Sequence, residues 1–191
     1  MRPAMTDKEI VVYKKLLEET DHYLESGCGG TTMIALSSNV PQIDVIETDI
    51  DWINKLKQKT EINLGEKENR LRFHHRDLGK VKQWGIPVDS SRIDNWPFFS
   101  LGVWQDLSDK IDFVFVDGRF RVATTLAALL MASEEATIML HDFKEREHYN
   151  DVLEFADVKE RVDTAIVLKR SNNFSSRAAM IAWSRFMHDA R

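Results

Sequence analysis

The chain alternates short apolar runs with longer segments in which apolar residues recur every three or four positions. Unbroken apolar runs are typical of buried strands, and the wider spacing is typical of amphipathic helices. The clearest strand lies at residues 111–116, which read Ile-Asp-Phe-Val-Phe-Val and stop at Asp117-Gly118. A run this apolar suits a strand that is buried on both faces of a parallel sheet.

The other predicted elements continue this alternation. Helices are expected at residues 6–19, 51–63, 122–133 and 145–155, the first opened by Thr6 and Glu9 at capping-box spacing. Strands are expected to end at Glu25 and Glu47 and to span residues 71–75, 136–140, 164–168 and 178–183. Helices between strands produce right-handed βαβ units, whereas the last two strands have only a polar turn between them. We therefore predict an α/β fold: a Rossmann-like, doubly wound, mostly parallel sheet with helices on both faces and a C-terminal antiparallel hairpin.

One stretch, residues 79–110, breaks the alternation. It carries Trp84, Trp96, Trp104, Phe98 and Phe99 with little periodicity. Long segments of this kind are usually functional or disordered, and the aromatic content argues against disorder. We expect one domain over residues 1–191, with an ordered insertion packed at the carboxyl end of the sheet. Its role stays open between a lid, an oligomer contact and a covering flap without a ligand.

Composition narrows the classes of function. A length of 191 residues suits one domain, and a net charge of −5 argues against a large nucleic-acid surface. Cys28 is the only cysteine, which excludes an intrachain disulfide and argues against a structural zinc cluster. We see neither a signal peptide nor an apolar run long enough to span a membrane. The expectation is a cytoplasmic protein without nucleic-acid or membrane partners, and a homo-oligomer stays open.

The turn from residue 25 to residue 32, Glu-Ser-Gly-Cys-Gly-Gly-Thr-Thr, is the most informative motif. Its glycines permit positive φ and let a ligand approach the backbone, and the helix that follows offers N–H groups to that ligand. Glu47 stands twenty positions after Gly27, at the end of the second strand, where it is placed to accept hydrogen bonds from ribose hydroxyls. The combination predicts a nucleoside-cofactor site, although glycines alone can also serve a tight turn.

Together with Asp77 after the third strand and Phe115-Val-Asp117-Gly118, these motifs resemble class I S-adenosylmethionine-dependent methyltransferases over about residues 21–143. The segment Asp-Gly-Arg-Phe-Arg-Val at 117–122 also resembles a small bacterial methyltransferase-like branch with no settled substrate. The resemblance implies a seven-stranded sheet whose final antiparallel strand is inserted between its neighbours, and S-adenosyl-L-methionine as the cofactor.

The resemblance also implies roles for residues on the cofactor side of the site. The methionine end would be held by Glu25 and by the backbone of Gly27, Cys28 and Gly29. The ribose diol would be bound by Glu47, the adenine would lie beside Thr48 and Asp49 or Ile50, and its amino group would donate to Asp77. Asp117 would sit near the sulfonium. Thr31 stands where the family often has a third glycine, and its hydroxyl is expected to cap the helix.

On the acceptor side, transfer to a hydroxyl benefits from a general base. The candidates at strand ends are Asp117, His141 and Asp142. Two acids there could also hold Mg²⁺, but related metal-dependent enzymes carry an Asn-type ligand where Phe143 stands, so no metal is assigned. Arg119 and Arg121 flank the same edge, where they either bind an anionic acceptor or pair with nearby acids.

We therefore expect an S-adenosylmethionine-binding protein that methylates a small or medium-sized acceptor of unknown identity. An NAD-dependent oxidoreductase fits less well, because Thr32 replaces the third glycine of the dinucleotide fingerprint. A non-catalytic Rossmann-like binding or scaffold protein stays open, since a fold alone does not decide function.

Overall fold

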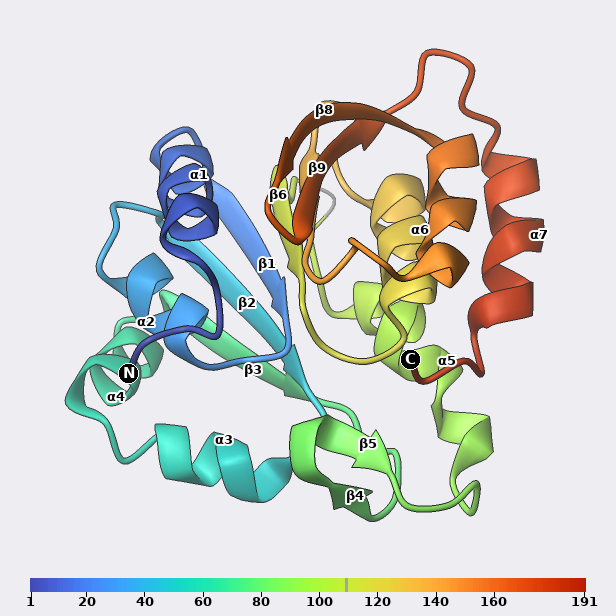
Figure 1. Cartoon of the computed structure of the whole chain (residues 1–191). Helices are drawn as coiled ribbons and strands as arrows, with labels where there is room; N and C mark the ends of the chain where they lie inside the picture. The colour runs from blue at the N-terminus through green and yellow to red at the C-terminus, as the bar shows by residue number, and fades with distance from the viewer. Residues whose placement is uncertain (109) are drawn as a thin grey trace.

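A seven-stranded sheet organises the chain in the computed structural model, which describes residues 1–108 and 110–191 (Figure 1). Its strand order is β3-β2-β1-β6-β7-β9-β8, with β9 antiparallel to both of its neighbours and the other adjacent pairs parallel. The strands are β1 (His22–Ser26), β2 (Gln42–Glu47), β3 (Leu71–His75), β6 (Phe113–Val116), β7 (Thr137–Leu140), β8 (Ala156–Val162) and β9 (Ala165–Arg170). The predicted mostly parallel sheet with a C-terminal hairpin is confirmed.

Helices cover both faces of this sheet (Figure 1). One face packs against α1 (Asp7–Glu18), α2 (Gly30–Leu36) and α4 (Thr60–Lys67), and the other against α5 (Pro97–Ser100), α6 (Arg121–Met131) and α7 (Ser176–Phe186). Strand β6 contributes side chains to the hydrophobic cores on both faces of the sheet. Phe113 and Phe115 pack with Tyr13 of α1 on one face, and Val114 and Val116 lie on the other. This burial on both faces explains why residues 111–116 are almost all apolar.

The prediction of a strand at residues 178–183 is wrong, because this segment belongs to helix α7. Its buried residues, Ala179, Ala182 and Trp183, recur at helical spacing, and the Ser175 side chain caps the helix by accepting from the Ala178 N–H at 3.3 Å. The hairpin is instead formed by β8 and β9, with Asp163 in a left-handed conformation at its turn. Strand β8 escaped detection because its charged central residues are exposed at the sheet edge.

Two helices also differ from expectation. The helix expected at residues 51–63 is divided into α3 (Ile50–Leu56) and α4 by an extended Lys59, whose ψ is 137°. Extended backbone cannot continue a helix. The segment Glu147–Glu154, within the helix expected at 145–155, adopts the tighter 3₁₀ form.

Residues of the predicted insertion contribute to the core and to the sheet edge. Phe99, Val103 and Trp104 are buried in the core that contains α6. A small hairpin of β4 (Val81–Lys82) and β5 (Ile86–Pro87) lies beyond the carboxyl ends of β2 and β3 (Figure 1), and Trp84 at its tip is 71% exposed. Asp109, also within the predicted insertion, lies outside the described residues. Within the described ranges, none of the helices has the length and apolarity needed to cross a bilayer.

Candidate cofactor and active site

Two glycine-containing turns meet at the carboxyl edge of the sheet. Gly27, after β1, has φ of 88°, and a Cβ there would lie 2.8 Å from the Cα of Gly118, after β6. In return, a Cβ on Gly118 would lie 2.7 Å from Oγ of Ser26. The Gly27 N–H donates to the carbonyl of Ile46 at 2.9 Å, which ties the first turn to β2. The close approach therefore requires glycine on both sides.

Glu47, at the end of β2, is bonded directly to the first turn. Its Oε2 accepts from the Cys28 N–H at 3.1 Å and from the Cys28 Sγ at 3.3 Å. Its Oε1 accepts from the N–H groups of Thr48 and Asp49 at 2.6 and 3.1 Å. Burial and the negative charge of Glu47 raise the pKa of the Cys28 thiol, so this cysteine is not primed as a nucleophile. The predicted pairing of turn and acid is thus present in the structure.

Glu25 is fully buried beneath the same turn. The hydroxyls of Thr31 and Thr32 both donate to its carboxylate. Burial outweighs these hydrogen bonds and raises the pKa of Glu25 to about 8. The expectation that Thr31 caps the helix is wrong: the N-cap is Gly29, whose N–H donates to Oγ1 of Thr32 at 2.9 Å. The two threonines instead hold the buried acid in place.

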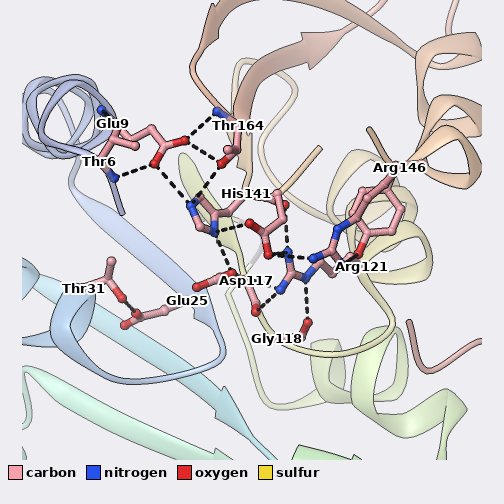
Figure 2. A network of polar contacts seen from close by, with 12 residues as sticks. Thr6, Glu9, Glu25, Thr31, Asp117, Gly118, Arg121, His141, Arg146 and Thr164 are labelled. Carbon is pink, nitrogen blue, oxygen red and sulfur yellow. Dashed lines mark hydrogen bonds and ion pairs between the residues drawn. The ribbon is translucent and has the colours of Figure 1, made fainter. Parts of the chain in front are cut away.

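Asp117 follows directly after β6 and belongs to a charged network with His141 and Arg121 (Figure 2). Its Oδ1 lies 2.9 Å from Nδ1 of His141 and 3.2 Å from Nη2 of Arg121. Among the described residues, no side chain bonds its Oδ2, and the Asp117 side chain is 30% exposed. One carboxylate oxygen is therefore anchored while the other remains open to a ligand.

Asp142, the next acid, shares Arg121 with Asp117. Its Oδ2 accepts from Nη1 of Arg121 at 3.0 Å and from Nη2 of Arg146 at 2.9 Å. Burial alone would raise the pKa of Asp142, but the charges of Arg121 and His141 outweigh it and lower that pKa. Arg121 is nearly fully buried and also donates to the carbonyl of Gly118. Of the two roles considered for Arg121, the structure shows pairing with neighbouring acids.

Glu9, which the site prediction missed, completes this network from helix α1 (Figure 2). Its Oε2 lies 3.4 Å from Nε2 of His141, and its Oε1 accepts from the N–H and hydroxyl of Thr164 at 2.8 and 2.6 Å. Burial alone would lower the pKa of His141, but the Asp117 hydrogen bond and the surrounding acids raise it. An imidazolium can donate to acids on both sides. Glu9 precedes Tyr13 and Leu17 at helical spacing, which is the sequence signal that it faces the core.

The acids of this network do not suit a magnesium ion. Asp117, His141 and Asp142 each offer a ligand atom within 4.8 Å of the others. However, the Arg121 guanidinium already lies against both carboxylates, so a metal would have to displace a buried cation. Phe143 offers no ligand atom and is buried under the Arg161 guanidinium, 5.4 Å from the ring centroid.

Two further predicted residues lie in local turns. Oδ1 of Asp49 accepts from the N–H groups of Asp51 and Trp52 at 3.0 and 3.1 Å and so caps α3. Oδ1 of Asp77 accepts from the Gly79 N–H at 2.9 Å, and its side chain is about half exposed. The structure therefore brings Glu25, Gly27, Cys28, Glu47 and Asp117 to one edge, while Asp77 bonds within the loop that follows β3.

Comparison with solved structures places this arrangement in a known fold. A methyltransferase-like protein from Silicibacter pomeroyi DSS-3 matches with a TM-score of 0.83 and 24% identity, covering 98% of each chain. An O-methyltransferase from Bacillus cereus in complex with SAH matches with a TM-score of 0.58 and 11% identity, over 88% of this chain and 84% of that one. SAH-bound methyltransferase PaMTH1 from Podospora anserina matches with a TM-score of 0.59 and 11% identity, over 88% and 80%. A scan against protein-family models and a search of curated proteins found no match. The chain thus has the fold of class I methyltransferases.

Proposed function

We propose that this protein binds S-adenosyl-L-methionine and transfers its methyl group to a small or medium-sized acceptor. The observation that carries the proposal is the contact between Cys28 and Glu47, which places a carboxylate beside a glycine turn at the carboxyl edge of the sheet. Open α/β sheets bind ligands at this edge. The proposal retains the sequence-based expectations of a cytoplasmic location and of no nucleic-acid partner.

Strand order favours a methyltransferase over an NAD-dependent enzyme. The dinucleotide-binding fold has the order 3-2-1-4-5-6 in a mostly parallel sheet. Here an antiparallel strand, β9, is inserted between β7 and β8. The SAH-bound neighbours supply an independent reason to prefer S-adenosylmethionine, since SAH is its demethylated product.

The residues at the turn fit such a cofactor. A Cβ placed on Gly29 would meet no atom closer than Sδ of Met1 at 4.0 Å, so this backbone is not closely packed against other groups. Oγ of Ser26 is buried and has no hydrogen-bond partner among the described residues. The buried Glu25 carboxylate gains stability from a cationic ligand such as an α-ammonium group. In this proposal Glu25 and the glycine turn after β1 hold the methionine end of the cofactor. Glu47 holds the ribose, with Thr48 and Asp49 nearby. Asp77 would accept a hydrogen bond from the adenine amino group.

The proposed chemistry is an in-line displacement for which the protein mainly aligns the reactants. S-adenosylmethionine supplies a methyl group that is already activated by a positively charged sulfur. The acceptor oxygen or nitrogen bonds the methyl carbon while the methyl–sulfur bond breaks and its electron pair stays on sulfur. Asp117 takes the acceptor's proton on Oδ2, because His141 and Arg121 occupy Oδ1. His141 and Asp142 act by holding Asp117 and Arg121 in place.

Asp117→Asn tests this role without changing the size of the side chain. With methyl-labelled cofactor and a metabolite extract, the wild type should label a product, and the variant should label it about 10²–10⁴-fold more slowly, the usual effect of losing a general base. Asp151→Asn, at an exposed position, is the control. Unchanged labelling by Asp117→Asn would remove Asp117 from the reaction. Cofactor binding without any labelled product would favour the non-catalytic binding protein.

Glu47→Ala should weaken binding of S-adenosylhomocysteine (SAH) by about 1–3 kcal/mol, the scale for hydrogen bonds to a charged acceptor. It should also lower stability, because the N–H groups of Cys28, Thr48 and Asp49 lose their acceptor. Isothermal titration calorimetry on the folded variant checks the prediction, with the exposed Glu68→Ala as control. An unchanged dissociation constant would show that Glu47 does not touch the ligand.

A further inference from the structure

Arg119 is the cation at this edge that the charged network does not use. It lies two positions after Asp117, in the turn between β6 and α6. Its Nε is buried without a hydrogen-bond partner, and the described residues provide no ion pair for its guanidinium. Its neighbour Arg121, by contrast, contacts both Asp117 and Asp142. Among the described residues, the Arg119 guanidinium is thus left without a hydrogen bond or an ion pair.

The surroundings of Arg119 make this arrangement costly. Burial and the nearby charges of Arg121 and Arg146 lower the pKa of Arg119, although Asp117 and Tyr149 oppose that effect. The buried Nε of Arg119 has lost hydration that no hydrogen bond replaces. An anion that binds the guanidinium from outside would offset this cost.

The β4–β5 hairpin lies close to both Arg119 and the proposed cofactor site. Trp84 and Gly85 at its tip both have φ of 67°, a conformation that bulky residues rarely adopt. A Cβ on Gly85 would lie 2.5 Å from Oγ1 of Thr48, 3.8 Å from Oε1 of Glu47 and 3.9 Å from Cγ of Arg119. Gly85 at the hairpin tip therefore lies close to Thr48 and Glu47, at the proposed ribose end of the site, and also close to the side chain of Arg119.

We propose that Arg119 binds an oxyanion of the methyl acceptor, a carboxylate or a phosphate, and so directs the acceptor's nucleophile toward Asp117. A guanidinium offers paired donors that match both oxyanions. Because Arg119 lies two residues from Asp117, the proposed base, it would fix the distance between the acceptor's anionic group and its methylated atom. This inference rests on the proposed function, and it assigns an anionic substrate class to the same site.

The test is titration of the SAH-saturated protein with sodium benzoate and with inorganic phosphate at constant ionic strength, followed by NMR. At least one anion should bind saturably to the wild type. Arg119→Gln should raise its dissociation constant at least tenfold, and Arg119→Lys, which keeps the charge without the planar fork, should give an intermediate value. Arg177→Gln, an exposed arginine on α7, should leave it unchanged. Retained SAH affinity in Arg119→Gln shows that the variant is folded.

Three results would overturn the inference: no saturable binding of either anion, an equal dissociation constant in the wild type and Arg119→Gln, or an equal loss of SAH affinity in that variant. The last would mean that Arg119 binds the carboxylate of the cofactor. If Arg119→Gln does not fold, Arg119→Lys decides, and anion binding as tight as in the wild type contradicts the proposal. Titrations without SAH separate this question from cofactor binding, so a protein that fails to bind SAH still reports on Arg119.

Discussion

Gly27→Ala should lower the free energy of unfolding by about 3 kcal/mol, the combined scale of left-handed strain and overpacking. Two physical reasons act together. The φ of 88° is unfavourable for any residue with a Cβ, and that Cβ would lie 2.8 Å from backbone atoms of Gly118. Backbone cannot move aside as a flexible side chain can, so the two turns must separate. Urea denaturation measures the stability change.

The same substitution should abolish detectable SAH binding, because separating the turns displaces both Glu25 and Asp117. The control is Glu68→Ala, at an exposed position, which should change neither the free energy of unfolding nor the SAH affinity. Full stability and full SAH affinity in Gly27→Ala would contradict the geometry of the site.

Glu25→Gln should make the protein more stable at pH 8 and yet bind SAH more weakly. In the folded protein the pKa of Glu25 is about 8, against an ordinary value of 4.5. Because the folded pKa is raised, the contribution of Glu25 to stability is fully present below pH 4.5 and is lost as pH rises toward 8. Within this window the wild type should lose about 1.4 kcal/mol per pH unit through this residue.

The glutamine variant lacks this slope, so its free energy of unfolding should exceed that of the wild type increasingly from pH 5 to pH 8. Its SAH affinity at pH 8 should fall by about 1.5–3 kcal/mol, the scale for a hydrogen bond to a charged group. Denaturation at several pH values and calorimetry check both parts, with the exposed Glu68→Gln as control. Parallel stability curves for the wild type and Glu25→Gln, together with equal SAH affinity, would show that Glu25 neither titrates in this range nor contacts the ligand.

Parts of the site that depend on short-range spacing were predictable from sequence. The glycine turn follows β1, Glu47 ends β2 and Asp117 follows β6, and parallel strands bring their carboxyl ends to one edge. The structure confirms the predicted sheet around them, because strand β6 and its neighbours are buried on both faces.

The missed features depend on contacts between distant segments. Glu9 reaches His141 across 132 positions, and only its place on the buried face of α1 gave a hint. Strand β8 is an edge strand with charged, exposed residues, so it lacks an apolar pattern. Helix α7 was mistaken for a strand because Ala178 to Trp183 is a short, mostly apolar run, for which helix and strand patterns overlap.

Burial of charge connects these observations with the proposed function. Glu25, Glu9, Arg121 and His141 all lie at or below the surface of one sheet edge, where each needs partners. The protein supplies hydroxyls for Glu25, Thr164 for Glu9 and two acids for Arg121. Among the described residues, no side chain bonds Oδ2 of Asp117 or the Arg119 guanidinium, and at these two points we expect a substrate to complete the site.

The central claim is that the turn after β1 binds S-adenosylmethionine, and calorimetric titration of the wild-type protein tests it most directly. S-adenosylmethionine and SAH should each bind with one-to-one stoichiometry, and NAD should give no heat of binding at the same concentrations. Binding of NAD alone, or of none of the three ligands at millimolar concentration, would contradict the account.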